Sequence, residues 1–438
     1  MVEPDERLAP APPEPATSPS ATEEGRTGWR ALAVDLGPLR RHRDFRLLVA
    51  SRAVSFFGSM ITFVAVPYQT FRLTRSSFAV GALGAAELAC LLSSAFLGGA
   101  LADAVDRRRL VLACEAALGL CSGALLANAA LTHPHVWVLF VAAGAIAGLT
   151  GLQRPALEAL VPRLVESHEL SSASAISSLQ GTAAMILGPA LAGLLIAGPG
   201  LPATFAVDVA TFVLSLVALA AMQAAPPPPG AERPTVARVL EGFRYARSRQ
   251  ELIGSYLVDM GAMFFGMPMA LFPAIASRHG GAGALGAIYA APSAGAFVAT
   301  VTSGWTSRVH RHGQAIVAAA TIWGAAIVVF GLAGPLWLAL AALVLAGAAD
   351  MVSGIFRMTM WNRTIPDALR GRLASIELVS YTSGPLLGNT EAGAAAALFG
   401  VRASVVSGGA LCVAAVLVTS AALPAFRAYD DRRGEPPA

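Results

Sequence analysis

Ionisable side chains inside long apolar stretches are the residues of this chain that could carry chemistry. Asp350 lies near the middle of one such stretch and Arg357 follows it, while Asp259 and Arg154 lie in two others. A charge within hydrocarbon is costly, so such residues are functional hypotheses by default. A carboxylate can take up and release a proton, whereas an arginine stays charged and binds anions. These residue types predict proton transfer and anion binding.

Asp350 is the first choice for the proton carrier and Asp259 the second. Arg357 is about two helical turns from Asp350 and therefore on a similar face. It could hold an anionic substrate, or hold Asp350 ionised. Glu87 and Glu377 are weaker candidates for the same pathway. The alternative for all of these residues is a structural ion pair, including one that locks a gate.

Methionines at helical spacing offer a second kind of contact. Met263 and Met267 lie four residues apart, so one helix face carries both. Flexible, polarisable thioethers suit a cavity that accepts varied ligands. The alternative is ordinary helix packing.

Composition shows which elements must position these residues. The chain has 438 residues, of which 55% are hydrophobic and 13% charged, and its mean hydropathy is +0.62. Soluble domains carry about 25% charged residues. A membrane-spanning helix needs about 20 apolar residues. We therefore expect an all-α integral membrane protein with twelve transmembrane helices in two six-helix bundles. The predicted spans are 46–71, 77–101, 108–131, 135–161, 170–197, 203–222, 251–276, 283–306, 313–333, 335–362, 372–398 and 402–426.

The arginines predict the orientation, because positive charge gathers on the cytoplasmic side. Only Arg72, Arg75, Arg278 and Arg402 fall in loops on the other side. The expected protein is a multi-pass plasma-membrane protein with both termini in the cytoplasm. Its expected parts are a disordered cytoplasmic tail 1–38, an N-terminal bundle 39–222, a cytoplasmic linker 223–250 with an amphipathic helix from about 234 to 247, a C-terminal bundle 251–427 and a cytoplasmic tail 428–438.

A charged turn over residues 98–109 joins two of these spans. It resembles the loop motif Gly-x-Leu-Ala-Asp-x-x-Gly-Arg-Arg of the major facilitator superfamily, and Asp106 departs from the motif's glycine. The matching residues are Gly99, Leu101, Ala102, Asp103, Arg107 and Arg108. The resemblance implies a cytoplasmic gate at Gly99, Asp103, Arg107 and Arg108. It also implies two bundles that rock about a midplane site.

A second motif and an internal repeat agree with this resemblance. Gly188-Pro189 looks like the helix-5 motif of drug:proton antiporters, although a packing groove is the alternative. It recurs as Gly384-Pro385, and the segment around Arg154 recurs around Arg357. Parallel repeats of six helices are typical of the superfamily.

Longer segments sharpen the resemblance within the superfamily. The segments 154–165, 256–268 and 365–373 are similar to the enterobactin exporter subgroup, which also resembles macrolide and other drug exporters. The implied function is proton-coupled export of small amphipathic molecules, most of all enterobactin-type siderophores. A multidrug or macrolide exporter is the alternative, and a receptor or scaffold without transport is an alternative of another class.

The remaining expectations concern partners. The seven histidines are scattered along the chain. Two pairs are close in sequence, His133 with His135 and His310 with His312, and neither has a third ligand nearby. No metal site is therefore expected. No phosphate-cradling motif is present, so neither a cofactor nor direct use of ATP is expected. The chain is not expected to be an enzyme. The expected partners are a small-molecule substrate, a proton and the lipid bilayer, without nucleic acid, for a monomer.

Overall fold

Long helices build the whole described part of the chain. The computed structural model describes residues 35–223, 245, 247–365 and 367–433, with the backbone alone over 95–104, 367–381 and 433. No strand occurs within these residues. Eleven helical segments are long and apolar enough to cross a membrane. The 33-residue α14 (Asp367–Phe399), whose first half lacks described side chains, is the twelfth helix of that length. The predicted all-α membrane fold with twelve spans is confirmed.

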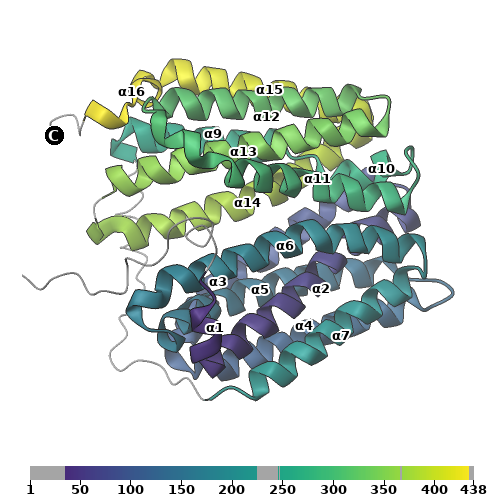
Figure 1. Cartoon of the computed structure of the whole chain (residues 1–438). Helices are drawn as coiled ribbons and strands as arrows, with labels where there is room; N and C mark the ends of the chain where they lie inside the picture. The colour runs from purple at the N-terminus through teal and green to yellow at the C-terminus, as the bar shows by residue number, and fades with distance from the viewer. Residues whose placement is uncertain (1–34, 224–244, 246, 366, 434–438) are drawn as a thin grey trace, which may run out of the picture.

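The helices form two groups, which Figure 1 shows as a lower and an upper set. The lower set contains α1 (Gly37–Arg41), α2 (Arg43–Thr74), α3 (Ser77–Ala104), α4 (Arg107–Ala129), α5 (Val136–Leu164), α6 (Leu170–Ala197) and α7 (Leu201–Ala220). The upper set contains α9 (Gln250–Phe265), α10 (Phe272–Ala276), α11 (Ala282–Val301), α12 (His312–Leu332), α13 (Leu336–Thr364), α14, α15 (Val401–Ala422) and α16 (Pro424–Ala428).

Two predicted spans are interrupted. The seventh, predicted as one helix over 251–276, breaks into α9, a 3-10 turn Met269–Leu271 and α10. Gly266 is the C-cap of α9, and its N–H makes the last helical hydrogen bond, to the Ala262 carbonyl at 2.8 Å. Pro268, two residues later, has no N–H to continue the helix. The last span, predicted over 402–426, ends at Ala422 before Pro424 starts α16. The structure also forms a 3-10 helix over Ser303–Arg308, where the eighth span was expected to continue.

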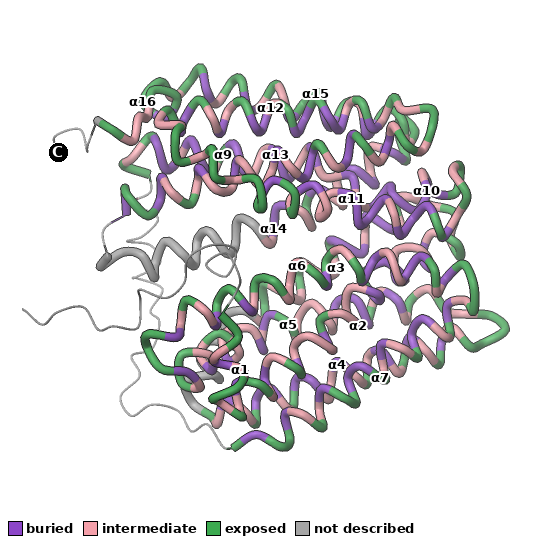
Figure 2. The backbone as a smooth tube through the Cα atoms, in the orientation of Figure 1, coloured by how far each residue is buried: buried purple, intermediate pink, exposed green. Residues whose placement is uncertain are grey.

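Burial follows the helix faces that meet other helices, as Figure 2 shows. The segment from α9 to α10 is the most enclosed of the eleven spans, because 61% of its apolar window is buried against 28% to 44% in the others. Small residues allow the close approach that association within lipid requires. A Cβ at Gly254, for example, would lie 2.3 Å from the Phe426 ring.

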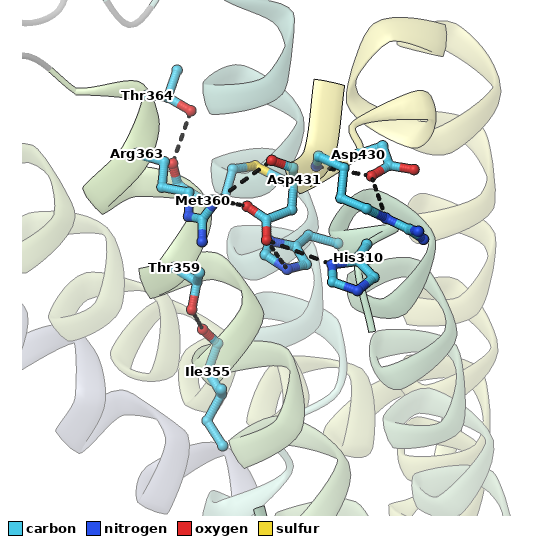
Figure 3. Close-up of polar contacts among 10 residues, drawn as sticks. His310, Ile355, Thr359, Met360, Arg363, Thr364, Asp430 and Asp431 are labelled. Carbon is cyan, nitrogen blue, oxygen red and sulfur yellow. Dashed lines mark hydrogen bonds and ion pairs between the residues drawn. The ribbon is translucent and has the colours of Figure 1, made fainter. Parts of the chain in front are cut away.

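The C-terminal segment is tied to the ends of α12 and α13. Asp431 forms an ion pair with Arg363, and its Oδ2 lies 3.8 Å from His310 Nδ1 and 4.0 Å from His312 Nε2. Its backbone N–H donates to the His310 carbonyl at 2.9 Å. Figure 3 shows Asp431 between His310 and Arg363. This contact fixes the path of the chain after α15.

The predicted linker falls mostly outside the described residues, as do the N-terminal tail up to residue 34 and the expected amphipathic helix. Tyr245 is described, and its hydroxyl donates to the Thr364 carbonyl at 3.0 Å. The end of the linker is therefore bonded to the end of α13.

Candidate functional site

An arginine and two aspartates meet between α9 and α13. Arg357 forms an ion pair with Asp259, and its Nη2 lies 4.0 Å from Asp350 Oδ1. The side chains of Asp259 and Arg357 are 7% and 12% exposed, whereas that of Asp350 is 41% exposed. The structure thus brings together the three residues predicted for the proton and anion pathway. Arg357 pairs with Asp259, the second choice for the proton carrier. Asp350, the first choice, remains partly exposed.

Helix geometry explains how this cluster forms. Two turns of α13 separate Asp350 from Arg357, so both side chains lie toward the same neighbour. That neighbour is the enclosed α9, which supplies Asp259. A buried ion pair offsets its desolvation cost only when its geometry is close and further polar contacts assist. The cluster is therefore a costly arrangement, of the kind that marks pathways within membranes.

A small cavity lies against the cluster. Its volume is ≈ 10 Å³, which is about the room of a single water molecule. The walls come from α9, α12 and α13 and consist of Val258, Asp259, Ala262, Ala320, Trp323, Asp350, Ser353 and Arg357. Two carboxylates, a guanidinium and an indole thus surround one space. Such a space can hold a water or a polar substrate group that bonds to Asp350.

Trp323 and Ser353 line the cavity, and sequence reasoning missed both. The Trp323 side chain is buried, and its Nε1 has no hydrogen-bond partner within the described residues. It lies against the break after α9, where a Cβ on Gly266 would be 2.4 Å from Nε1. Ser353 follows Asp350 by three residues, a helical spacing that could have identified it. Trp323 lacks such a signal, because it comes from another helix.

The other predicted pathway residues lie apart from the cluster. Glu87 of α3 is half-buried and interacts electrostatically with Tyr289 of α11. Met263 is buried against Gly384 of α14. A Cβ added at Gly384 would lie 2.9 Å from the Cβ of Met263. Met267 is partly buried against the main core. The side chain of Glu377 falls outside the described residues. Met263 therefore has the packing contact that was its alternative interpretation.

Arg154 occupies a more open position than its repeat counterpart Arg357. Its Nε donates to Glu158 Oε1 at 2.9 Å, and the two side chains are 38% and 62% exposed. Arg52 of α2 interacts electrostatically with both. The repeat in sequence therefore places an open basic cluster in one half and a buried pair in the other.

The gate motif is described in part. Asp106, which replaces the motif's glycine, caps α4 by accepting from the Arg109 N–H at 2.9 Å. Arg108 donates to the carbonyls of Leu219 and Ala220 at 3.0 and 2.6 Å, so it caps the end of α7. Arg107 reaches the Ala159 carbonyl at 3.4 Å. These arginines join α4 to α5 and α7, while the side-chain positions of Gly99 and Asp103 lie outside the described part.

The helix-5 motif lies where helices approach closely. A Cβ on Gly188 would be 2.5 Å from Met60 Cβ on α2. The carbonyl of Pro189 faces Gly286 of α11, at 2.7 Å from the position of a Cβ there. Gly384, its repeat counterpart, packs on α9 in the same manner as Gly188 on α2. Gly188 and Pro189 therefore lie at packing contacts, one within their own half and one toward the other half.

The two halves touch through glycines at the end of the molecule opposite the C-terminus. Gly81 of α3 meets Gly393 of α14, and Gly193 of α6 meets Gly286 of α11. An added Cβ on Gly81 would lie 2.9 Å from Gly393 Cα, and one on Gly193 would lie 2.8 Å from Gly286 Cα. Thr390 Oγ1 also donates to the Gly81 carbonyl at 3.2 Å. This end of the molecule is thus closed by backbone contact.

Comparisons with known proteins agree on a transporter. The family model for transmembrane secretion effectors matches residues 33–436. The enterobactin exporter EntS of Citrobacter koseri is 28% identical over 389 residues, covering 88% of this chain and 93% of its own length. EntS of Escherichia coli O157:H7 has the same identity and coverage.

Solved structures show the same fold. The nucleoside transporter NupG superimposes with a TM-score of 0.69 at 13% identity, covering 86% of this chain and 98% of that one. An inward-facing bacterial homologue of the transporter Spinster gives a TM-score of 0.64 at 15% identity, covering 88% and 95%. The fold, the motifs and the family match together show that this multi-pass membrane protein is a transporter of small molecules and not an enzyme. The chain belongs to the transmembrane secretion effector family of the major facilitator superfamily.

Proposed function

We propose that the protein is a proton-coupled exporter of enterobactin-type siderophores that works by alternating access in the cell membrane. Both termini face the cytoplasm, and the rocking units are the bundles 39–222 and 251–427. The single observation that carries the proposal is the cluster of Asp259, Asp350 and Arg357 within the membrane-embedded part of α9 and α13. The family match adds the exporter role, and the identity to EntS supports the substrate class.

Asp350 carries the proton in this proposal. Its side chain lines the small cavity, which has room for one water, and Arg357 lies only 4.0 Å away. In this proposal a water in the cavity exchanges the proton with Asp350. When Asp350 is ionised, its carboxylate can accept strong hydrogen bonds from hydroxyl groups of the substrate, while Arg357 stays paired with Asp259. Protonation of Asp350 removes the charge that strengthens these bonds. Proton and substrate therefore compete for Asp350, as export against inward proton flow requires.

The contact between the two halves supports the alternating-access part of the proposal. The glycine pairs close the end opposite α1 and α16, which is the outer end in the proposed orientation. Backbone atoms meet at these glycines, so opening this end in the proposed cycle breaks few side-chain contacts. Export then requires the outer contacts to open while the cytoplasmic side closes.

The test is transport in vesicles with an imposed pH gradient. Full-length protein is reconstituted, and movement of enterobactin is measured with and without the gradient. Asp350→Asn is compared with the wild type and with Glu166→Gln, whose loop carboxylate is 68% exposed. Erythromycin, a macrolide, serves as the second probe.

The expected result is gradient-dependent enterobactin transport in the wild type and Glu166→Gln. Asp350→Asn should lose uphill transport while still binding enterobactin. Uphill transport by Asp350→Asn would remove that residue from coupling, and Asp259 would be the next to test. Gradient-driven transport of erythromycin without that of enterobactin would replace the siderophore by the macrolide class.

A further inference from the structure

A groove opens at the end of the molecule that carries few charged residues. Its volume is ≈ 470 Å³, and it lies between the end of α12, the segment after α10 and the start of α15. Arg278 and Arg402 line it together with Leu332, Phe399 and Val406. These two arginines are half of those that the sequence places in loops on the outer side.

Positive charge in the groove is unbalanced. Neither Arg278 nor Arg402 forms an ion pair within the described residues, and both are exposed. The groove also contains the start of the 22-residue helix α15, whose first turn has no acidic residue and no side-chain cap. The N-terminus of a helix carries partial positive charge and free N–H groups. Two guanidinium groups and a helix terminus therefore favour an anion here.

The rest of the groove is apolar. Phe399 is 72% exposed and Leu332 is 51% exposed. Both lie at helix ends, where a spanning helix passes from hydrocarbon to headgroups. A small soluble anion would use the arginines but leave these side chains unused. A ligand with an anionic head and a hydrocarbon tail would use both.

The surrounding loops strengthen the charge argument. Arg75 lies in these loops and Arg72 in the last turn of α2, and the loops contain no aspartate or glutamate. They cover residues 75–76, 130–135, 198–200, 277–281, 333–335 and 400. No nearby loop carboxylate therefore competes for Arg278 or Arg402.

We propose that this groove binds an anionic phospholipid. Its phosphate lies between Arg278 and Arg402 at the start of α15, and an acyl chain lies along Phe399, Leu332 and Val406. In the orientation proposed above the lipid belongs to the outer leaflet. The bound lipid joins α12 to α15 at the closed end of the transporter. This inference needs the membrane-spanning fold but not the proposed substrate or proton coupling.

Native mass spectrometry of the full-length protein tests this site. Protein is released from nanodiscs of phosphatidylglycerol mixed with phosphatidylcholine, and retained lipids are identified and counted. The variants are Arg278→Gln, Arg402→Gln and their combination. The matched control is Arg72→Gln with Arg75→Asn, which removes the other two arginines at this end of the molecule. Asparagine is chosen at position 75 because it tolerates the left-handed backbone there, where φ is 54°. Inorganic phosphate is the competing probe.

The wild type and the control should retain one phosphatidylglycerol more than the combined variant. The ratio of lipid-bound to lipid-free protein should fall about fivefold for each single variant and roughly 25-fold for both, which is the effect of basic residues at an anionic membrane surface. Inorganic phosphate should not displace the lipid. Equal retention by the combined variant, or equal loss in the control, would overturn the proposal. Displacement by inorganic phosphate would assign the groove to a soluble anion and also overturn it.

Discussion

Replacement of Arg357 by glutamine should destabilise the protein strongly. Asp259 would keep its charge at a position where its side chain is 7% exposed. Removing one partner of a buried ion pair costs about 3 to 5 kcal/mol, because the other charge is left uncompensated. Asp350 would not replace the lost partner, since it is also negative.

Two further variants separate this charge effect from a loss of packing. The double variant Asp259→Asn with Arg357→Gln removes both charges, so its stability should lie close to that of the wild type. Arg154→Gln is the matched control, because Arg154 belongs to an exposed pair on its own helix. Its cost should be about 0.4 kcal/mol, as for exposed helix pairs.

The assay is unfolding of the purified protein in mixed micelles with increasing denaturing detergent, followed by circular dichroism. The reasoning would be refuted if Arg357→Gln cost no more than Arg154→Gln. It would also be refuted if the double variant were as unstable as Arg357→Gln alone. Transport by the stable double variant is a separate readout, and the proposed mechanism expects gradient-dependent export to be lost.

Three other predictions concern the gate, the cap and the C-terminal contact. Gly81→Leu should impair transport by preventing the outer end from closing, because an added Cβ would lie 2.9 Å from Gly393 Cα; transport at the wild-type rate by this variant would contradict this. Arg108→Gln should lower the free energy of unfolding by about 1 to 3 kcal/mol, because two carbonyls at the end of α7 lose a charged donor, as measured by detergent unfolding. Asp431→Asn should speed amide hydrogen exchange over 424–433 and leave exchange in α6 unchanged, since Asp431 bonds the C-terminal segment to Arg363; unaltered exchange over 424–433 would show that the contact is not needed.

The positions of the spans could be predicted because hydropathy and arginine placement are local signals. The structure begins α4 at Arg107 and ends it at Ala129, close to the predicted 108–131. The break after α9 was missed, although Gly266 and Pro268 are both present in the sequence. Within lipid, a span can continue past such residues when neighbours satisfy the freed backbone groups. Whether they do depends on the packing of Trp323, which the sequence does not reveal.

The candidate site was predicted as a set of residues but not as an arrangement. The spacing of Asp350 and Arg357 on one helix indicated a shared face, and that face does meet α9. The partner of Arg357 could not be chosen, because pairing across helices depends on their rotation and relative height. The groove at Arg278 and Arg402 was missed for the same reason, since those residues are distant in sequence and meet only in the fold.

A carboxylate in a span of the first half, Asp208, has different surroundings from Asp350 in the second half. This difference supports the choice of Asp350. Asp208 in α7 is fully buried and accepts hydrogen bonds from Thr62 at 2.6 Å and Ser122 at 2.7 Å. Hydroxyl donors satisfy such a group without giving it a path to water. Asp350 is 41% exposed, lines a small cavity and lies near a guanidinium. A coupling residue must exchange its proton with the surroundings and change a neighbouring charge balance as it does so. Of these two carboxylates, only Asp350 has both properties in the described structure.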